Sequence, residues 1–178
     1  MQRFSTFVMA VVVFAFSAPN HSQVVSVSRP GKIATYFNSE RNITTVVMGF
    51  SDVGGESACG LYLSANGSYE GKTAAQPNKI TLLIMRITPE EKIKSAPLRD
   101  LTFTPDGELM DIGVMETASQ QTNMDLRLET LQLSISFESF VRIANAKKVE
   151  AKLGSAKFEL TTNNLNFMSQ FADKFKVR

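Results

Sequence analysis

Two short runs near the C-terminus alternate strictly between apolar and charged or small polar residues, and a Gly154-Ser155 pair separates them. Alternation with a period of two is typical of a strand with one buried face, and glycine in the first central position suits a type II′ turn. The sequence therefore predicts a β-hairpin over 148–160 that turns its apolar residues toward a core. These residues are Val149, Ala151, Leu153, Ala156, Phe158 and Leu160.

A two-residue turn also fixes the register of this hairpin, because the residues that flank the turn must pair. The predicted inner pairs are Leu153 with Ala156, Ala151 with Phe158, and Val149 with Leu160. On the outer face, Glu150 would oppose Glu159 and Lys152 would oppose Lys157, with opposite charges on the diagonals. Glu150 and Glu159 would be a conceivable catalytic carboxylate pair, but mixed charge is typical of a solvated strand face.

Segments with helical spacing flank the hairpin on both sides. Ser136 is a suitable N-cap for a helix whose apolar face lies at 140–144. After the hairpin, a threonine or asparagine at 161–163 can cap a second helix with an apolar stripe. The stripe consists of Leu165, Met168, Phe171, Ala172 and Phe175. Residues 137–178 are therefore predicted to form a helix–hairpin–helix unit.

Most of the preceding chain consists of short runs of β-branched and aromatic residues between turn residues, which is typical of strands. The last of four such runs has apolar residues on both parities, so we expect a strand that is covered on both faces. A polar stretch at 88–97 is then interpreted as a connection that Pro97 ends. The four runs span 32–39, 44–55, 59–69 and 78–88.

A second hairpin is predicted at 98–115, with its turn at 105–107. Asp106, Glu108 and Asp111 lie close together in this stretch and have the residue types of a calcium site. Their spacing does not match a twelve-residue calcium loop and no second ligand set occurs, so we interpret them as turn chemistry. The apolar residues that lead into and out of the turn are Leu101, Phe103, Met110, Ile112 and Val114.

The segment 124–137 carries two apolar sets of opposite parity, one before Glu129-Thr130 and one after it. Such a switch predicts a β-bulge or a bend that turns the face of the strand. A helix is the alternative, but the clean alternation at the end favours a strand. The two sets are Leu126 and Leu128, then Leu131, Leu133, Ile135 and Phe137. The polar run at 119–123 is interpreted as the connection that precedes this strand.

Residues 1–17 have the order of a secretory signal peptide. Arg3 precedes an apolar run, and the small residues Ala15 and Ser17 follow at the positions of a cleavage site. The run has about ten residues, whereas a membrane-spanning helix needs about 20. We therefore expect export of residues 18–178, to the periplasm or the exterior, with no transmembrane segment after signal cleavage.

Residues 18–178 are expected to form a single exported β-rich domain, with 137–178 as its C-terminal α/β unit. A chain with 43% hydrophobic and 20% charged residues is ordinary for one folded domain. The charge is uneven, because 147–178 carries seven basic and three acidic residues. Contact of this basic region with an anionic surface is one interpretation. A solvated face with positive charge near helix C-termini is the simpler one.

Few residues of the chain suit catalysis or metal binding. Cys59 is the single cysteine, which excludes an internal disulfide, and we interpret it as a buried, inert thiol. His21 is the single histidine and lies beside the predicted signal peptide, so nucleophile–histidine constellations are not expected. No zinc motif and no phosphate-binding glycine loop occurs. The sequence thus predicts no catalytic, cofactor-binding or metal-binding residues and no nucleic-acid partner.

The stretch FVRIANAKKVEAKLGSAKFELT at 140–161, followed by a short amphipathic helix, resembles the C-terminal unit of a loose group of uncharacterised exported bacterial proteins. The matching residues are Ile143, Ala144, Ala146, Val149, Glu150, Leu153, Gly154, Phe158, Glu159 and Leu160. The resemblance covers roughly the last quarter of the chain. It implies a bacterial exported β-rich domain and, because the group has no assigned activity, no catalytic residues.

We therefore predict a mainly β fold, a β-sandwich or a curled antiparallel sheet, with a C-terminal helix–β-hairpin–helix unit. The predicted function is a non-catalytic binding or interaction module of the bacterial envelope or exterior. Its partner would be an unknown small molecule or an envelope protein, and no cofactor is expected. A carboxylate-dependent hydrolase and a structural subunit of an envelope assembly are the alternatives.

Overall fold

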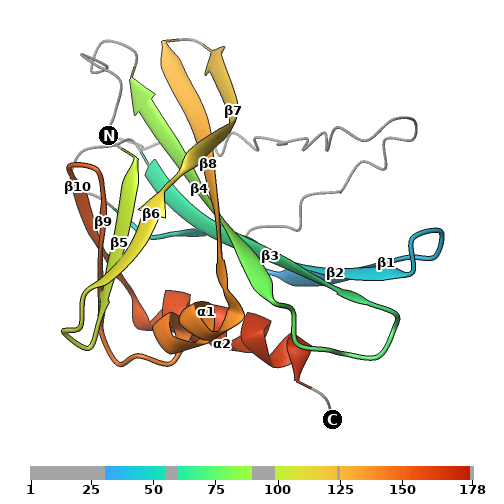
Figure 1. Ribbon diagram of the computed structural model, residues 1–178. Helices are drawn as coiled ribbons and strands as arrows, with labels where there is room; N and C mark the ends of the chain where they lie inside the picture. The colour runs from blue at the N-terminus through green and yellow to red at the C-terminus, as the bar shows by residue number, and fades with distance from the viewer. Residues whose placement is uncertain (1–30, 55–59, 90–98, 124, 177–178) are drawn as a thin grey trace, which may run out of the picture.

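The structure is a computed structural model that describes residues 31–54, 60–89, 99–123 and 125–176 (Figure 1). The strands are β1 (Ile33–Asn38), β2 (Ile43–Asp52), β3 (Gly60–Glu70), β4 (Lys79–Pro89), β5 (Asp100–Pro105), β6 (Met110–Val114), β7 (Glu116–Asn123), β8 (Leu126–Ser136), β9 (Val149–Leu153) and β10 (Ala156–Leu160). The helices are α1 (Phe137–Ala144) and α2 (Thr162–Ala172), and a 3-10 turn, η2 (Asp173–Phe175), follows α2. The predicted signal peptide, His21 and Cys59 lie outside the described residues, as does most of the predicted connection at 88–97.

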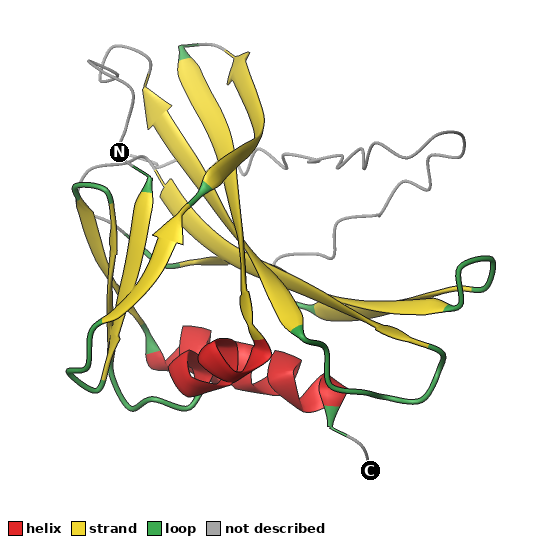
Figure 2. Ribbon diagram, viewed as in Figure 1, coloured by secondary structure: helices red, strands yellow, loops and turns green. Residues whose placement is uncertain are grey.

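The strands form two antiparallel sheets (Figures 1 and 2). The larger sheet has the order β1-β2-β3-β4-β8-β7, and the smaller sheet has the order β10-β9-β5-β6. Strands distant in sequence are neighbours in both sheets, since β4 pairs with β8 and β5 pairs with β9. The predicted mainly β fold with a C-terminal helix–hairpin–helix unit is confirmed.

One hydrophobic core joins both sheets and both helices. Phe103 of β5, Phe140 of α1 and Phe171 of α2 are among its largest fully buried side chains. The rings of Phe140 and Phe171 meet edge to face with their centroids 5.3 Å apart, a favoured aromatic geometry. Both helices lie across one end of the two sheets (Figure 2), so the C-terminal unit completes the core rather than standing apart from it.

The predicted C-terminal hairpin is confirmed pair by pair, with Ala151 opposite Phe158 and both buried. Gly154 has a φ of 59°, as the first central position of a type II′ turn requires. The Ser136 side chain accepts a hydrogen bond from Ser139 N at 3.0 Å and caps α1. Of the three candidates for the second cap, Thr161 takes the position and forms a capping box with Asn164.

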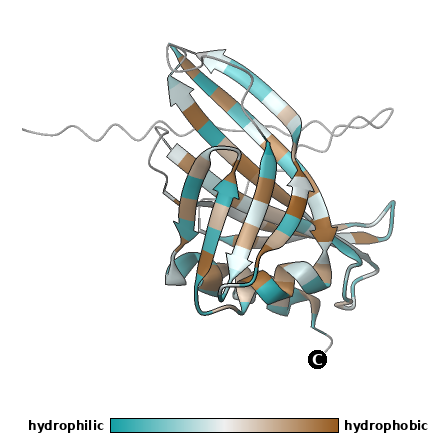
Figure 3. Cartoon of the chain, turned by 60° about the vertical axis from the view of Figure 1, so that its left-hand side comes forward, coloured by the Kyte–Doolittle hydropathy of each residue, from teal (hydrophilic) through white to brown (hydrophobic). Residues whose placement is uncertain are grey.

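The larger sheet has an inner face toward this core and an outer face away from it, and β4 is covered on both, as predicted. Leu82 and Ile84 point to the inner face and belong to the main core. Leu83 and Met85 point to the outer face, where they form a second cluster with Phe50. Figure 3 shows the alternation of hydrophobic and hydrophilic residues along the strands that produces these faces.

The prediction of a connection at 119–123 is wrong, because these residues belong to strand β7. This strand lies at the edge of the larger sheet and pairs with β8 alone. An edge strand that faces solvent on both sides needs no apolar alternation. Because residues 119–123 are polar, their sequence pattern did not indicate a strand.

The prediction of a bulge or bend at Glu129-Thr130 is also wrong. β8 pairs with β4 in unbroken register, from Lys79 opposite Ser136 to Pro89 opposite Leu126. The register shift in this part of the sheet lies in the partner strand β7, between Thr117 and Ser119. The parity of the apolar residues changes because a charged residue, Glu129, occupies an inward position.

The second hairpin is confirmed, but its apolar residues do not keep one parity. A register shift between Leu101 and Thr102 places two β6 residues, Asp111 and Gly113, opposite successive residues of β5. Beyond the irregularity, Val114 is 60% exposed and the next residue, Met115, is buried instead. A β-bulge reverses the faces to which the following side chains point, which explains why Met115 is buried in place of Val114.

Candidate functional site

Asp106 lies in the predicted turn and holds two segments together. Asp106 and Gly107 both have positive φ, 50° and 90°, which is the type I′ geometry. The Asp106 carboxylate accepts hydrogen bonds from the backbone N–H groups of Lys147 and Lys148, both at 3.0 Å. Its own N–H donates to the Lys148 carbonyl at 2.8 Å. The turn interpretation is confirmed, and Asp106 anchors this turn to the chain before β9.

The other acidic residues near this turn do not converge on a site. Glu108 forms an ion pair with Arg142 of α1, and this hydrogen bond lowers the pKa of Glu108 and raises that of Arg142. Asp111 is exposed on β6. Across the residues that the structure describes, no group of three or more His, Cys, Asp or Glu side chains is placed to hold a metal ion.

Glu150 and Glu159 lie opposite each other on the outer side of the C-terminal hairpin. Lys148 Nζ lies between them, 2.8 Å from Glu150 Oε1 and 3.7 Å from Glu159 Oε2. The hydrogen bond to Lys148 lowers the pKa of Glu150, and Glu150 raises the pKa of Lys148. All three side chains are more than half exposed, so they lie on a solvated strand face, as predicted, and Lys148 rather than Lys152 or Lys157 supplies these ion pairs.

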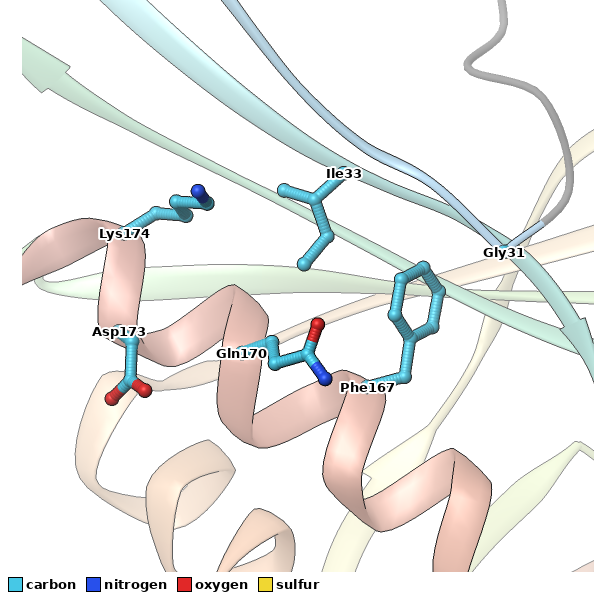
Figure 4. A pocket seen from close by; sticks show the side chains of 6 residues that line it. All are labelled: Gly31, Ile33, Phe167, Gln170, Asp173 and Lys174. Carbon is cyan, nitrogen blue, oxygen red and sulfur yellow. The ribbon is translucent and has the colours of Figure 1, made fainter.

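A depression of about 390 Å³ lies between the start of β1 and helix α2 (Figure 4). It is lined by Gly31, Ile33, Phe167, Gln170, Asp173 and Lys174. Asp173 points away from Ile33 in this view and is bound to Lys176 at 2.6 Å. Binding sites for small molecules combine an apolar wall with polar groups that converge on the ligand. The polar groups here do not converge, so the depression is the weaker of two candidates.

The stronger candidate is a charge cluster around the buried Glu129 on the inner face of the larger sheet, which we call the arginine–glutamate cluster. It consists of Arg86 of β4, Arg99 just before β5, Arg127 and Glu129 of β8, and Thr117 of β7. Glu129 is only 1% exposed. Its inward orientation follows from its parity with Leu131, which lies in the main core two residues further on.

Two arginines neutralise Glu129 from different parts of the fold. Arg86 lies directly opposite Glu129 in the β4–β8 register, and its Nη2 donates to Glu129 Oε2. Arg99 Nη2 donates to the other carboxylate oxygen, Oε1, at 2.9 Å. Thr117 Oγ1 lies 3.5 Å from the same oxygen. Because Arg99 leads into the smaller sheet, the cluster joins the two sheets at this end.

Arg127 extends the cluster along the same face. It lies two residues from Glu129 on β8 and opposite Thr88 of β4. Its Nη2 donates to Gln120 Oε1 at 2.6 Å. The Nε–H groups of Arg99 and Arg127 are buried, and neither has a hydrogen-bond partner within the described part of the chain. A buried donor left unpaired costs about 1–3 kcal/mol, so these two groups are sites where a partner would be stabilising.

Sequence reasoning missed this cluster. Its members come from positions 86, 99, 117, 127 and 129, and only the sheet topology brings them together. The local signal was the charged residue at an inward position of β8, which makes the apolar parity change at Glu129. Had the parity change been interpreted as an inward-facing carboxylate, the sequence would have predicted Glu129 as one member of the cluster and a cationic partner for it.

No protein family, curated protein or solved structure matches this chain. The resemblance of residues 140–161 to exported bacterial proteins therefore stays a prediction. None of the helices in the described ranges has the length and apolar character needed to cross a membrane.

Proposed function

We propose that this protein is a non-catalytic binding module of the bacterial envelope or exterior, and that the arginine–glutamate cluster is its binding site. One observation carries the proposal: Glu129 is 1% exposed, at a position that would otherwise be apolar core, and is bound by Arg86 and Arg99. Taking such charges out of water is costly, and their mutual attraction often fails to repay the cost.

The cluster is therefore hard to explain by stability alone. An apolar residue at position 129, with apolar partners, would bury the same face at equal or lower cost. The arginines are also not sealed away, because Arg86 is 17% and Arg99 is 32% exposed. Polar groups that are held rigidly and still reach the surface are typical of a binding site.

Export is part of the same proposal and is supported by the sequence of residues 1–17. Arg3, the short apolar run and the small residues before Ala18 have the order of a signal peptide. The resemblance of the C-terminal unit to exported bacterial proteins points to the same compartment. A binding module in that setting would meet small molecules or other envelope proteins.

Native mass spectrometry of protein purified from its own host tests both parts together. We expect a chain that lacks about the first 17 to 23 residues and retains a small ligand that is released when the protein unfolds. A full-length chain would contradict export. A fixed stoichiometry with other chains would instead favour a structural subunit, and a chain with neither ligand nor partner would contradict the binding module and leave the hydrolase alternative open.

A further inference from the structure

We infer that the arginine–glutamate cluster binds an oxyanion, namely a carboxylate, phosphate or sulfate group of a larger ligand. The inference rests on the proposed function and adds the chemical class of the ligand. Among the residues that the structure describes, the cluster has three guanidinium groups and one carboxylate, an excess of two positive charges. The described side chains at neighbouring inward positions of β4 and β7 are uncharged: Thr88, Thr117, Gln120 and Thr122.

The hydrogen-bond donors give the second argument. Both oxygens of Glu129 already accept from arginine, one from Arg86 and one from Arg99. A guanidinium group has five N–H donors and no acceptor. Among the residues that the structure describes, the buried Nε–H groups of Arg99 and Arg127 meet no acceptor, so a ligand could supply one. A ligand that supplies oxygen acceptors with negative charge would satisfy both donors and the excess charge together.

The shape of the arginine side chain narrows the ligand class. Its planar fork matches the paired oxygens of a carboxylate or phosphate, and such charge-assisted bonds are short and strong. A cationic ligand has no free carboxylate to meet here, since Glu129 is occupied by Arg86 and Arg99. Arg127 and Arg99 are thus the residues that contact the anion. Glu129 is a positioning residue, because it holds Arg99 in place.

Isothermal titration of the purified protein with simple anions tests the inference. Phosphate, sulfate and acetate are titrated separately at constant ionic strength set with chloride, and the three arms distinguish the source of the oxyanion. We expect saturable binding of at least one of them below about 10 mM. Arg127→Gln leaves both contacts of Glu129 intact and should weaken that binding by at least about tenfold.

Two further variants make the result decisive. Arg127→Lys keeps the charge but removes the Nε–H and the fork, so binding should weaken to an intermediate degree. Arg41→Gln removes an exposed arginine from the turn between β1 and β2 and should change nothing. Circular dichroism and thermal melting confirm that each variant is folded.

Two results would overturn the inference: no oxyanion binds the wild-type protein, or Arg41→Gln weakens binding as much as Arg127→Gln. Such a failure is distinguishable from failure of the proposed function. If native mass spectrometry still finds a retained ligand without an acidic group, the binding module stands and the oxyanion does not. If a simple anion binds but no ligand is ever retained from the host, the oxyanion site stands and the proposed binding module does not.

Discussion

Strands β4 and β8 run side by side for eleven residues each, yet the two halves of this pair use the inner face of the sheet in opposite ways. In one half, which we call the core half, the inner residues are apolar. They are Ile80, Leu82, Ile84, Leu131, Leu133 and Ile135. In the other, the charged half, the inner residues are Arg86, Thr88, Arg127 and Glu129.

The outer face shows the reverse distribution. In the core half it carries Thr81, Gln132 and Ser134, apart from Leu83, whereas in the charged half it carries Thr130 and four apolar residues. The four apolar residues are Met85, Ile87, Leu126 and Leu128. Because the register does not change, the difference lies in polarity and not in backbone geometry. The core half holds the fold together, and the charged half offers a site where a ligand can bind.

The largest effect is expected from removing an aromatic ring from the core. Phe158 is 8% exposed and faces Ala151 across the C-terminal hairpin. Phe158→Ala should lower the free energy of unfolding by about 3–5 kcal/mol, because it leaves a cavity. Its neighbour on the opposite face provides the control: Lys157→Ala should cost less than about 1 kcal/mol. Urea titration measures both, and equal losses would show that the faces are assigned wrongly.

A smaller loss in the free energy of unfolding is expected from a substitution in the charged half. Glu129→Leu leaves Arg86 and Arg99 without their carboxylate, and we expect a loss of about 1–3 kcal/mol, because both arginines retain some contact with water. Urea titration against the wild-type protein measures this loss. A loss as large as that of Phe158→Ala would mean that the cluster is a structural element of the core.

A triple replacement removes Glu129 and its two arginine partners without leaving any of these charges unpaired. Glu129→Leu with Arg86→Met and Arg99→Met removes all three charges and keeps the bulk. Its stability should return to within about 1 kcal/mol of the wild-type protein or exceed it, since apolar residues often replace a buried ion pair without cost. Oxyanion binding should be lost in the same variant. A triple variant that is less stable than Glu129→Leu alone would contradict a functional role for the charges.

The sequence predicted the C-terminal hairpin and the start of α1 well, because the residues there follow local rules. The hairpin register follows from Gly154 and strict alternation, and the cap at Ser136 follows from its position before an apolar helix face. The charged half follows no local rule. Glu129 lies inward because Arg86 and Arg99, distant in sequence, reach the same point. The polar edge strand β7 was missed for a similar reason, since it is specified by pairing and not by its own pattern.

The smallest effect is expected at the exposed pair of Lys148 and Glu150. Lys148 lowers the pKa of Glu150 below its ordinary value of 4.5, so the pair stabilises the fold above that pH. This contribution is lost as the pH falls through the lowered value. Glu150→Gln should therefore make the decline of stability below about pH 4.5 slightly shallower, as urea titrations at several pH values would show. Lys148→Met should flatten the profile in the same way, and an unchanged profile in both variants would contradict the pair.

Nitrogen-15 NMR of the arginine side chains tests most directly whether the charged half of the inner face binds an oxyanion. The Nε–H groups of Arg99 and Arg127 are buried, so their signals should be protected from exchange with water and assignable by substitution. On titration with the anion that binds most tightly, both signals should shift in a saturable way, as expected of new charge-assisted hydrogen bonds, while that of Arg41 stays in place. Shifts that are absent, or that are small and equal for all arginines without saturation, would contradict the site.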